Sequence, residues 1–213
     1  MGWLVRFITS SIGKKQFMAV TGFCFMGFLV AHLAGNLSIL YGPESLTAYA
    51  DKLHSLGPVI TLAELGLIAL ALIHVSTGLW LFIGNLMARP ERYAVSKSAG
   101  GKTVSSRTMP YTGLLILAFI VIHLLNFLFA DMTKTTLGEI VYDYFKSPGG
   151  VVFYLGAMII VGFHIRHGFW SAFQTVGANH PKYMPLIETG SIIFAVILAA
   201  GFGALPVFVL VAG

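Results

Sequence analysis

The chain has 213 residues, of which 57% are hydrophobic and 10% are charged, and its formal net charge at pH 7 is +5. A mean hydropathy of +0.85 excludes an ordinary soluble globular domain and makes a lipid bilayer the expected solvent. The basic residues alternate between the two ends of the apolar segments and form no single patch for a nucleic acid. We therefore expect an integral membrane protein with lipid around it and no nucleic-acid partner.

Five apolar segments are long enough to be transmembrane helices, each of which needs about 20 residues to cross the hydrocarbon core. We predict an all-α fold, with one membrane domain over residues 1–213 built as a bundle of five transmembrane helices. The first apolar segment is longer than the core of a signal peptide and is expected to remain in the protein. The predicted spans are about 17–41, 58–87, 109–130, 149–175 and 183–211.

The segments between the spans differ in character. Residues 1–16 form an amphipathic lead-in expected at the membrane interface, and residues 42–57 read as a short polar loop. Residues 88–108 are strongly basic and are expected to be a docking surface. The third span is predicted to begin after Pro110, because proline suits a first helical turn. Residues 136–145 form an amphipathic stretch expected to lie along the outer interface.

The distribution of positive charge predicts the orientation of the chain, because cytoplasmic segments carry an excess of Lys and Arg. The N-terminus is expected in the cytoplasm and the C-terminus outside, in a multi-pass protein of the cytoplasmic membrane. Lys52, Lys134 and Lys146 lie on the side assigned to the outside. The basic residues on the side assigned to the cytoplasm are Arg6, Lys14, Lys15, Arg89, Arg92, Lys97, Lys102, Arg107, Arg166 and Lys182.

Four of the seven histidines lie deep within separate predicted spans: His32, His74, His123 and His164. An ionisable group inside a membrane is costly and usually marks function, although a single one is equally well explained by a hydrogen bond between helices. At 1.5 Å of rise per residue, His32 and His123 share a depth in the outer half. His74 and His164 share a depth in the inner half. The histidines are therefore expected to form two facing pairs.

A shared motif accompanies the inner pair. The segments that start at His74 and His164 both read His-x-x-x-Gly-Φ-Trp, with Gly78 and Gly168 one turn after the histidine on the same helix face. A glycine there leaves room for a flat macrocycle. Two histidines per iron are typical of low-spin haem, whereas zinc requires four converging ligands. Because Cys24 is the single cysteine, we expect two haem b groups held by side chains alone.

His167 competes with His164 as the fourth ligand, because it lies three residues away on nearly the same face. His164 is favoured because it is followed by a glycine, Gly168, at the same spacing as His74 is followed by Gly78. Arg166 and His167 would then face a haem propionate, a lipid headgroup or simply a polar inner rim.

The order of these motifs resembles that of a known family. His32-x-x-Gly-Asn, His74-x-x-x-Gly, His123 and Phe163-His164-x-x-x-Gly-Φ-Trp follow one another in the first four of five spans. This order resembles the dihaem cytochrome b subunit that anchors bacterial succinate:quinone oxidoreductases, the succinate dehydrogenases and fumarate reductases, and the resemblance covers nearly the whole chain.

The resemblance implies partners, substrate and haem positions. The chain would bind a flavoprotein subunit and an iron–sulfur subunit on the cytoplasmic side, and would exchange electrons with quinone, menaquinone above all. It would belong to the enzyme complex without itself binding the dicarboxylate, and such complexes could pair as a dimer of heterotrimers. By position, His74 and His164 would hold the haem proximal to the iron–sulfur subunit, and His32 and His123 the distal haem.

Two further positions follow from the same resemblance. A loop glutamate assigned to quinone chemistry in some family members falls at His54, which would then be the catalytic proton carrier at an outer quinone site, with Glu64 as a weaker candidate. His54 could equally serve only as a cap of the loop before Pro58. Some members carry a proton-conducting glutamate two residues before the fourth ligand, where this chain has Gly162.

Two alternative functions use the same histidines. One is the cytochrome b of a membrane hydrogenase or formate dehydrogenase, which would differ in its soluble partner, a nickel or molybdenum enzyme instead of a flavoprotein. The other is a haem-free transporter in which the histidines relay protons, and an absorption spectrum would distinguish it.

Overall fold

The computed structural model describes residues 2–88 and 104–212, and the regular structure of these residues is entirely helical. Five segments are long and apolar enough to cross a membrane: 11–41, 58–87, 104–128, 148–175 and 184–212. The all-α fold and the multi-pass membrane architecture are thus confirmed. Most of the basic connection predicted as a docking surface, with Arg89, Arg92, Lys97 and Lys102, lies outside the described residues.

The helices are α1 (Trp3–Thr9), α2 (Ser11–Asn36), 3-10 helix η1 (Leu37–Tyr41), α3 (Pro43–His54), α4 (Pro58–Met87), α5 (Val104–His123), π-helical turn η2 (Leu124–Leu128), α6 (Leu137–Phe145), α7 (Pro148–Thr175) and α8 (Met184–Ala212).

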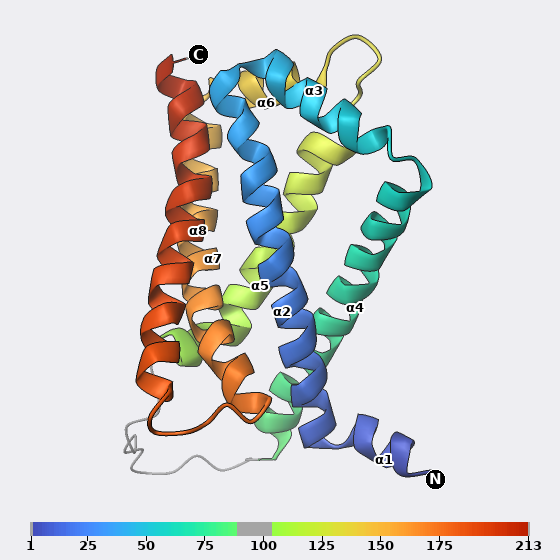
Figure 1. The fold of residues 1–213 in the computed structure, drawn as a ribbon, viewed down its shortest axis with the longest axis vertical. Coiled ribbons are helices and arrows are strands. Elements are labelled where there is room, and N and C mark those ends of the chain that lie inside the picture. The colour runs from blue at the N-terminus through green and yellow to red at the C-terminus, as the bar shows by residue number, and fades with distance from the viewer. Residues whose placement is uncertain (1, 89–103, 213) are drawn as a thin grey trace.

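The five long helices run up and down in sequence order, and the N- and C-termini lie at opposite ends of the bundle (Figure 1). The short helices α3 and α6 lie across the end that carries the C-terminus, whereas α1 projects from the other end. Helix α4 packs along α2 and leans away from α8 where α3 leads into it. Every side chain of α4 is at least partly exposed, as expected of a helix that faces lipid over much of its surface.

The best-packed part of the molecule joins α7 to α8 and to the short helices at the C-terminal end. Leu198 and Val209 of α8 are almost fully buried, and Tyr154 of α7 is 6% exposed at the centre of a group of aromatic rings. Small residues permit this close packing, because a Cβ at Gly162 would lie 3.2 Å from Ala199 Cβ. Gly162 is therefore a helix-packing position with little room for a longer side chain.

Three boundaries differ from prediction. Residues 43–54 form helix α3, not a polar loop, and Pro43 occupies its first turn. Helix α2 begins at Ser11, earlier than the predicted residue 17, because Ser10 caps it by accepting a hydrogen bond from Gly13 N at 3.0 Å. Helix α5 begins at Val104, so that Pro110 lies inside it. Proline removes the hydrogen bond of its own nitrogen and crowds the carbonyl group one turn earlier, yet α5 continues through Pro110.

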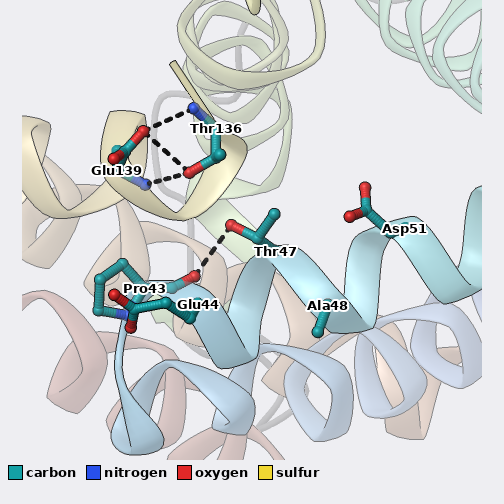
Figure 2. Close-up of a pocket in the computed structure, with 7 residues that line it drawn as sticks. All are labelled: Pro43, Glu44, Thr47, Ala48, Asp51, Thr136 and Glu139. Atoms are coloured by element: carbon teal, nitrogen blue, oxygen red, sulfur yellow. Dashed lines mark hydrogen bonds between the residues drawn. The ribbon is translucent and has the colours of Figure 1, made fainter.

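Helix α6 confirms the amphipathic stretch predicted for residues 136–145. Thr136 and Glu139 form a reciprocal capping box at its start, and Thr47 Oγ1 accepts a hydrogen bond from Gly138 N at 3.0 Å. A side chain at Gly138 would collide with the carbonyl of Pro43, so glycine is what lets α6 approach α3. Figure 2 shows the shallow pocket between the two helices, lined by Pro43, Glu44, Thr47, Ala48, Asp51, Thr136 and Glu139.

Candidate functional site

The outer pair of histidines consists of His32 near the end of α2 and His123 at the end of α5. Their ring centroids are 6.0 Å apart and the ring planes are nearly perpendicular, at 87°. Phe28 stacks on His32 at 5.1 Å, and Phe119 lies 5.7 Å from His123. Aromatic rings thus pack against both histidines of this pair.

The inner pair consists of His74 on α4 and His164 on α7, with ring centroids 6.5 Å apart and an interplanar angle of 62°. The structure therefore brings together the same two pairs that depth along the helices predicts. Thr21 contacts His74, and His32 follows eleven residues later on α2. Eleven residues of helix rise separate the two pairs by about 16 Å along the bundle.

Hydroxyl groups hold three of the four imidazoles by the same nitrogen. Thr21 Oγ1 lies 2.8 Å from His74 Nδ1, and Thr112 Oγ1 lies 3.1 Å from His164 Nδ1. Tyr154 Oη lies 3.1 Å from His123 Nδ1. A side-chain partner on one ring nitrogen is the usual companion of metal ligation through the other, because it fixes the orientation of the ring.

These hydroxyls were missed by sequence reasoning, although the sequence carries a signal for two of them. Thr21-Gly22 on α2 and Thr112-Gly113 on α5 are each followed by a histidine eleven residues later. The glycines make room for the rings, because a Cβ at Gly22 would lie 3.8 Å from His74 Cε1 and one at Gly113 would lie 3.4 Å from His164 Cε1. The repeat is visible only when α2 is compared with α5.

The geometry of both pairs fits one haem iron between each pair. An imidazole nitrogen binds a metal at about 2 Å, so two rings on opposite sides of one iron have centroids roughly 6 Å apart. The observed 6.0 and 6.5 Å agree with this spacing. Among the residues that the structure describes, no group of three or more His, Cys, Asp or Glu side chains converges as a larger metal site would need.

The motif glycines have different surroundings. A Cβ at Gly168 would meet nothing within 4 Å, which leaves the flank of α7 open one turn after His164. A Cβ at Gly78 would lie 3.2 Å from the terminal methyl of Met18, a flexible side chain. The role of both glycines beside a macrocycle stays a prediction. The tryptophans of the two motifs also make contacts. Lys14 Nζ lies 3.8 Å from the centroid of the Trp80 ring, and the rings of Trp170 and His167 pack edge to face with centroids 5.0 Å apart.

His167 does not face His74. Its Nδ1 is buried without a hydrogen-bond partner among the described residues. The neighbouring Arg166 donates a hydrogen bond to Ser105 Oγ at 3.3 Å, at the start of α5. The two side chains therefore lie at the predicted inner rim, near the end of the bundle to which α1 belongs.

The predicted quinone residue His54 is the last residue of α3 and is exposed. Within the described part of the chain, no hydrogen bond or ring contact joins it to His32 or His123. Glu64 is half-buried in α4, whereas Glu188 in α8 is exposed. The structure thus places His54 at the same end of the bundle as the outer pair without bringing them into contact.

No protein-family model, curated protein sequence or solved structure matches the chain.

Proposed function

We propose that this chain is a dihaem cytochrome b, in which His32 and His123 would hold an outer haem and His74 and His164 would hold an inner haem. The observation that carries the proposal is the facing of two histidine pairs, one histidine from each of four spans, at 6.0 and 6.5 Å. A haem held by two histidines carries one electron at a time and keeps no open position for oxygen.

The surrounding residues fit that role. Aromatic side chains pack against the outer pair, and hydroxyl groups contact the inner imidazoles at Nδ1, which would leave Nε2 of both rings for an iron. With the pairs about 16 Å apart along the bundle, two haems would form successive stations for an electron that crosses the membrane.

The biological role that this arrangement supports best is that of the membrane anchor of a succinate dehydrogenase or fumarate reductase. In this role the chain passes electrons between membrane quinone, menaquinone above all, and flavoprotein and iron–sulfur subunits on the cytoplasmic side. Support comes from the order of ligand motifs in the first four of five spans. The inner end also carries most of the basic residues of the described chain, among them Arg6, Lys14, Lys15, Arg107, Arg166 and Lys182.

A quinone site is proposed at the outer end, where His54 supplies or accepts the proton. His54 is exposed, and an imidazole in contact with water can pass a proton to it or take one from it. A soluble subunit docked at the opposite end would leave this site accessible.

The hydrogen bonds within the bundle favour the haem function over a histidine proton relay. Each link of a relay must accept a proton and donate one onward. Thr21 and Thr112 instead have carbonyl groups of their own helices within hydrogen-bonding distance, at 2.7 and 3.0 Å, and these carbonyls can accept the hydroxyl protons in place of the histidines. The cytochrome b of a hydrogenase or formate dehydrogenase would differ from the proposed anchor in its soluble partner, a nickel or molybdenum enzyme instead of a flavoprotein.

The test is to purify the protein from its native membrane with its associated subunits. A reduced-minus-oxidised spectrum of b-type haem, reduction of that haem by a menaquinol analogue and a co-purifying flavoprotein are the expected results. A spectrum without haem would overturn the proposal in favour of the transporter, and a nickel- or molybdenum-containing partner would favour the alternative cytochrome.

A further inference from the structure

The two threonines of the inner pair are alike in burial and in hydrogen bonding. Thr21 is 3% exposed, and its Oγ1 lies 2.7 Å from the carbonyl oxygen of Phe17 one turn earlier. Thr112 is 9% exposed, and its Oγ1 lies 3.0 Å from the carbonyl oxygen of Met109. Each hydroxyl has one proton, which we assign to these backbone carbonyls. Its oxygen can then only accept from the imidazole that faces it.

This direction fixes the tautomer of both inner histidines. His74 Nδ1 donates its proton to Thr21 Oγ1 at 2.8 Å, and His164 Nδ1 donates its proton to Thr112 Oγ1 at 3.1 Å. Nε2 of each ring is then unprotonated. A lone pair on Nε2 is what coordination of a metal by neutral histidine requires.

We propose that Thr21 and Thr112 are positioning residues that fix the tautomer of His74 and His164 and lower the midpoint potential of the inner haem. This inference rests on the proposed haem function. An Nδ1–H that donates a hydrogen bond makes the imidazole a stronger electron donor to its metal. A stronger donor stabilises the oxidised iron more than the reduced iron, and the potential falls.

The outer histidines have different hydrogen-bond partners, so the lowering of the midpoint potential by threonine is expected at the inner haem alone. Tyr154 Oη, 3.1 Å from His123 Nδ1, is a phenol on α7 and not a hydroxyl committed to its own helix backbone. Beside His32 lies Asn36 Nδ2, a donor 3.4 Å from Nδ1 that already bonds the His32 carbonyl oxygen at 2.8 Å. The threonine arrangement thus occurs at both ligands of the inner pair and at neither ligand of the outer pair.

The experiment is a spectroelectrochemical titration of both haems in the purified complex, with Thr21→Val and Thr112→Val as the test variants. Valine keeps the shape of threonine and removes the hydroxyl. The same one of the two midpoint potentials should rise in both variants, and the low-spin ferric EPR signal of that haem should change. Thr21→Ser and Thr112→Ser keep the hydroxyl and should restore the wild-type potential.

Matched controls remove hydroxyls that touch no histidine. Thr108, one turn before Thr112, donates its hydroxyl hydrogen bond to the carbonyl group of Val104. Ser76, two residues after His74, donates its hydroxyl hydrogen bond to the carbonyl group of Leu72. Thr108→Val and Ser76→Ala should leave both potentials in place. If a valine variant loses one haem while the serine variant keeps it, the positioning role is equally supported.

Unchanged potentials in both valine variants with both haems bound would overturn the inference, as would an equal shift in the controls or loss of haem in the serine variants. These results leave the proposed function intact, since the wild type still holds two haems. Absence of haem from the wild-type complex would instead refute the proposed function, and the inference with it.

Discussion

His164 and His167 lie three residues apart on α7, but only His164 faces His74 across the bundle. We predict that His164→Ala removes one of the two haems, because the iron between His74 and His164 loses an axial ligand. His167→Ala should leave both haems in place. Pyridine haemochrome analysis of the purified variants measures the difference. Loss of a haem from the His167 variant alone would show that the His-x-x-x-Gly motif predicts the wrong ligand on α7.

His54 is the residue by which the outer quinone site is tested. His54→Gln should slow quinone-linked turnover by about 10²-fold, the usual contribution of a general acid or base, while both haems and dye-linked succinate oxidation are retained. His180→Gln is the control, because His180 is also exposed but lies in the turn between α7 and α8 at the other end. Equal quinone-linked rates in the two variants would remove His54 from the mechanism.

The residues of the site differ in how far the sequence predicts them. Histidines stand out in an apolar span because their burial is costly, and helix rise alone is enough to pair them. Thr21 and Thr112 do not stand out, because threonine is common in membrane helices, where its hydroxyl bonds its own backbone. Their role depends on which helices are neighbours, and a single span does not contain that information.

At the scale of elements, the capping box of α6 makes a prediction about pH. The backbone N–H of Thr136, with the hydroxyls of Thr135 and Thr136, holds the pKa of Glu139 below its ordinary value of 4.5. A lowered pKa in the folded state stabilises the protein above the pKa of the unfolded chain, and the contribution disappears as pH falls through the folded value. Glu139→Gln should therefore lower the thermal stability in detergent at neutral pH, and the difference from wild type should shrink as the pH falls through the lowered pKa of Glu139.

Thr136→Ala removes the other half of the same cap and should cost about 1 kcal/mol of stability at neutral pH. Lys134→Ala, two residues before the cap residue Thr136, serves as the surface control. A Glu139→Gln effect that persisted unchanged in acid would show that the carboxylate charge does not stabilise α6.

The long helices were easier to predict than the short ones. Span 58–87 agrees with α4 at both ends, since Gly57 and Pro58 punctuate its start. The sequence predicts a loop at residues 42–57 because the segment is polar and short, whereas in the structure Leu46 of α3 is 4% exposed and belongs to a buried group with Ile39 and Val141. Helix α5 continues through Pro110 because Ser105, only 1% exposed, is packed at its start and accepts a hydrogen bond from Arg166.

At the scale of the whole molecule, the two termini lie at opposite ends of the bundle, and the excess of basic residues predicts which end faces the cytoplasm. A C-terminal alkaline phosphatase fusion should be active, because this enzyme folds outside the cytoplasm, where disulfides form. A fusion at Ala88, directly after α4, should be inactive. The reverse pattern would invert the assignment of the outer and inner pairs. The sequence does not predict how α4 leans from the bundle, since its apolar surface has nearly the same character all round.

The haem content of the purified wild-type protein tests the central claim most directly. Two pairs of facing imidazoles, each with the spacing of a single iron, predict about two haem b per chain, measured by pyridine haemochrome assay against protein concentration. All of this haem should be extractable by acid acetone, because the only cysteine, Cys24, lies outside any covalent attachment motif. The double variant His32→Ala, His74→Ala should bind none. A wild-type protein that contained one haem, or none, would contradict the account.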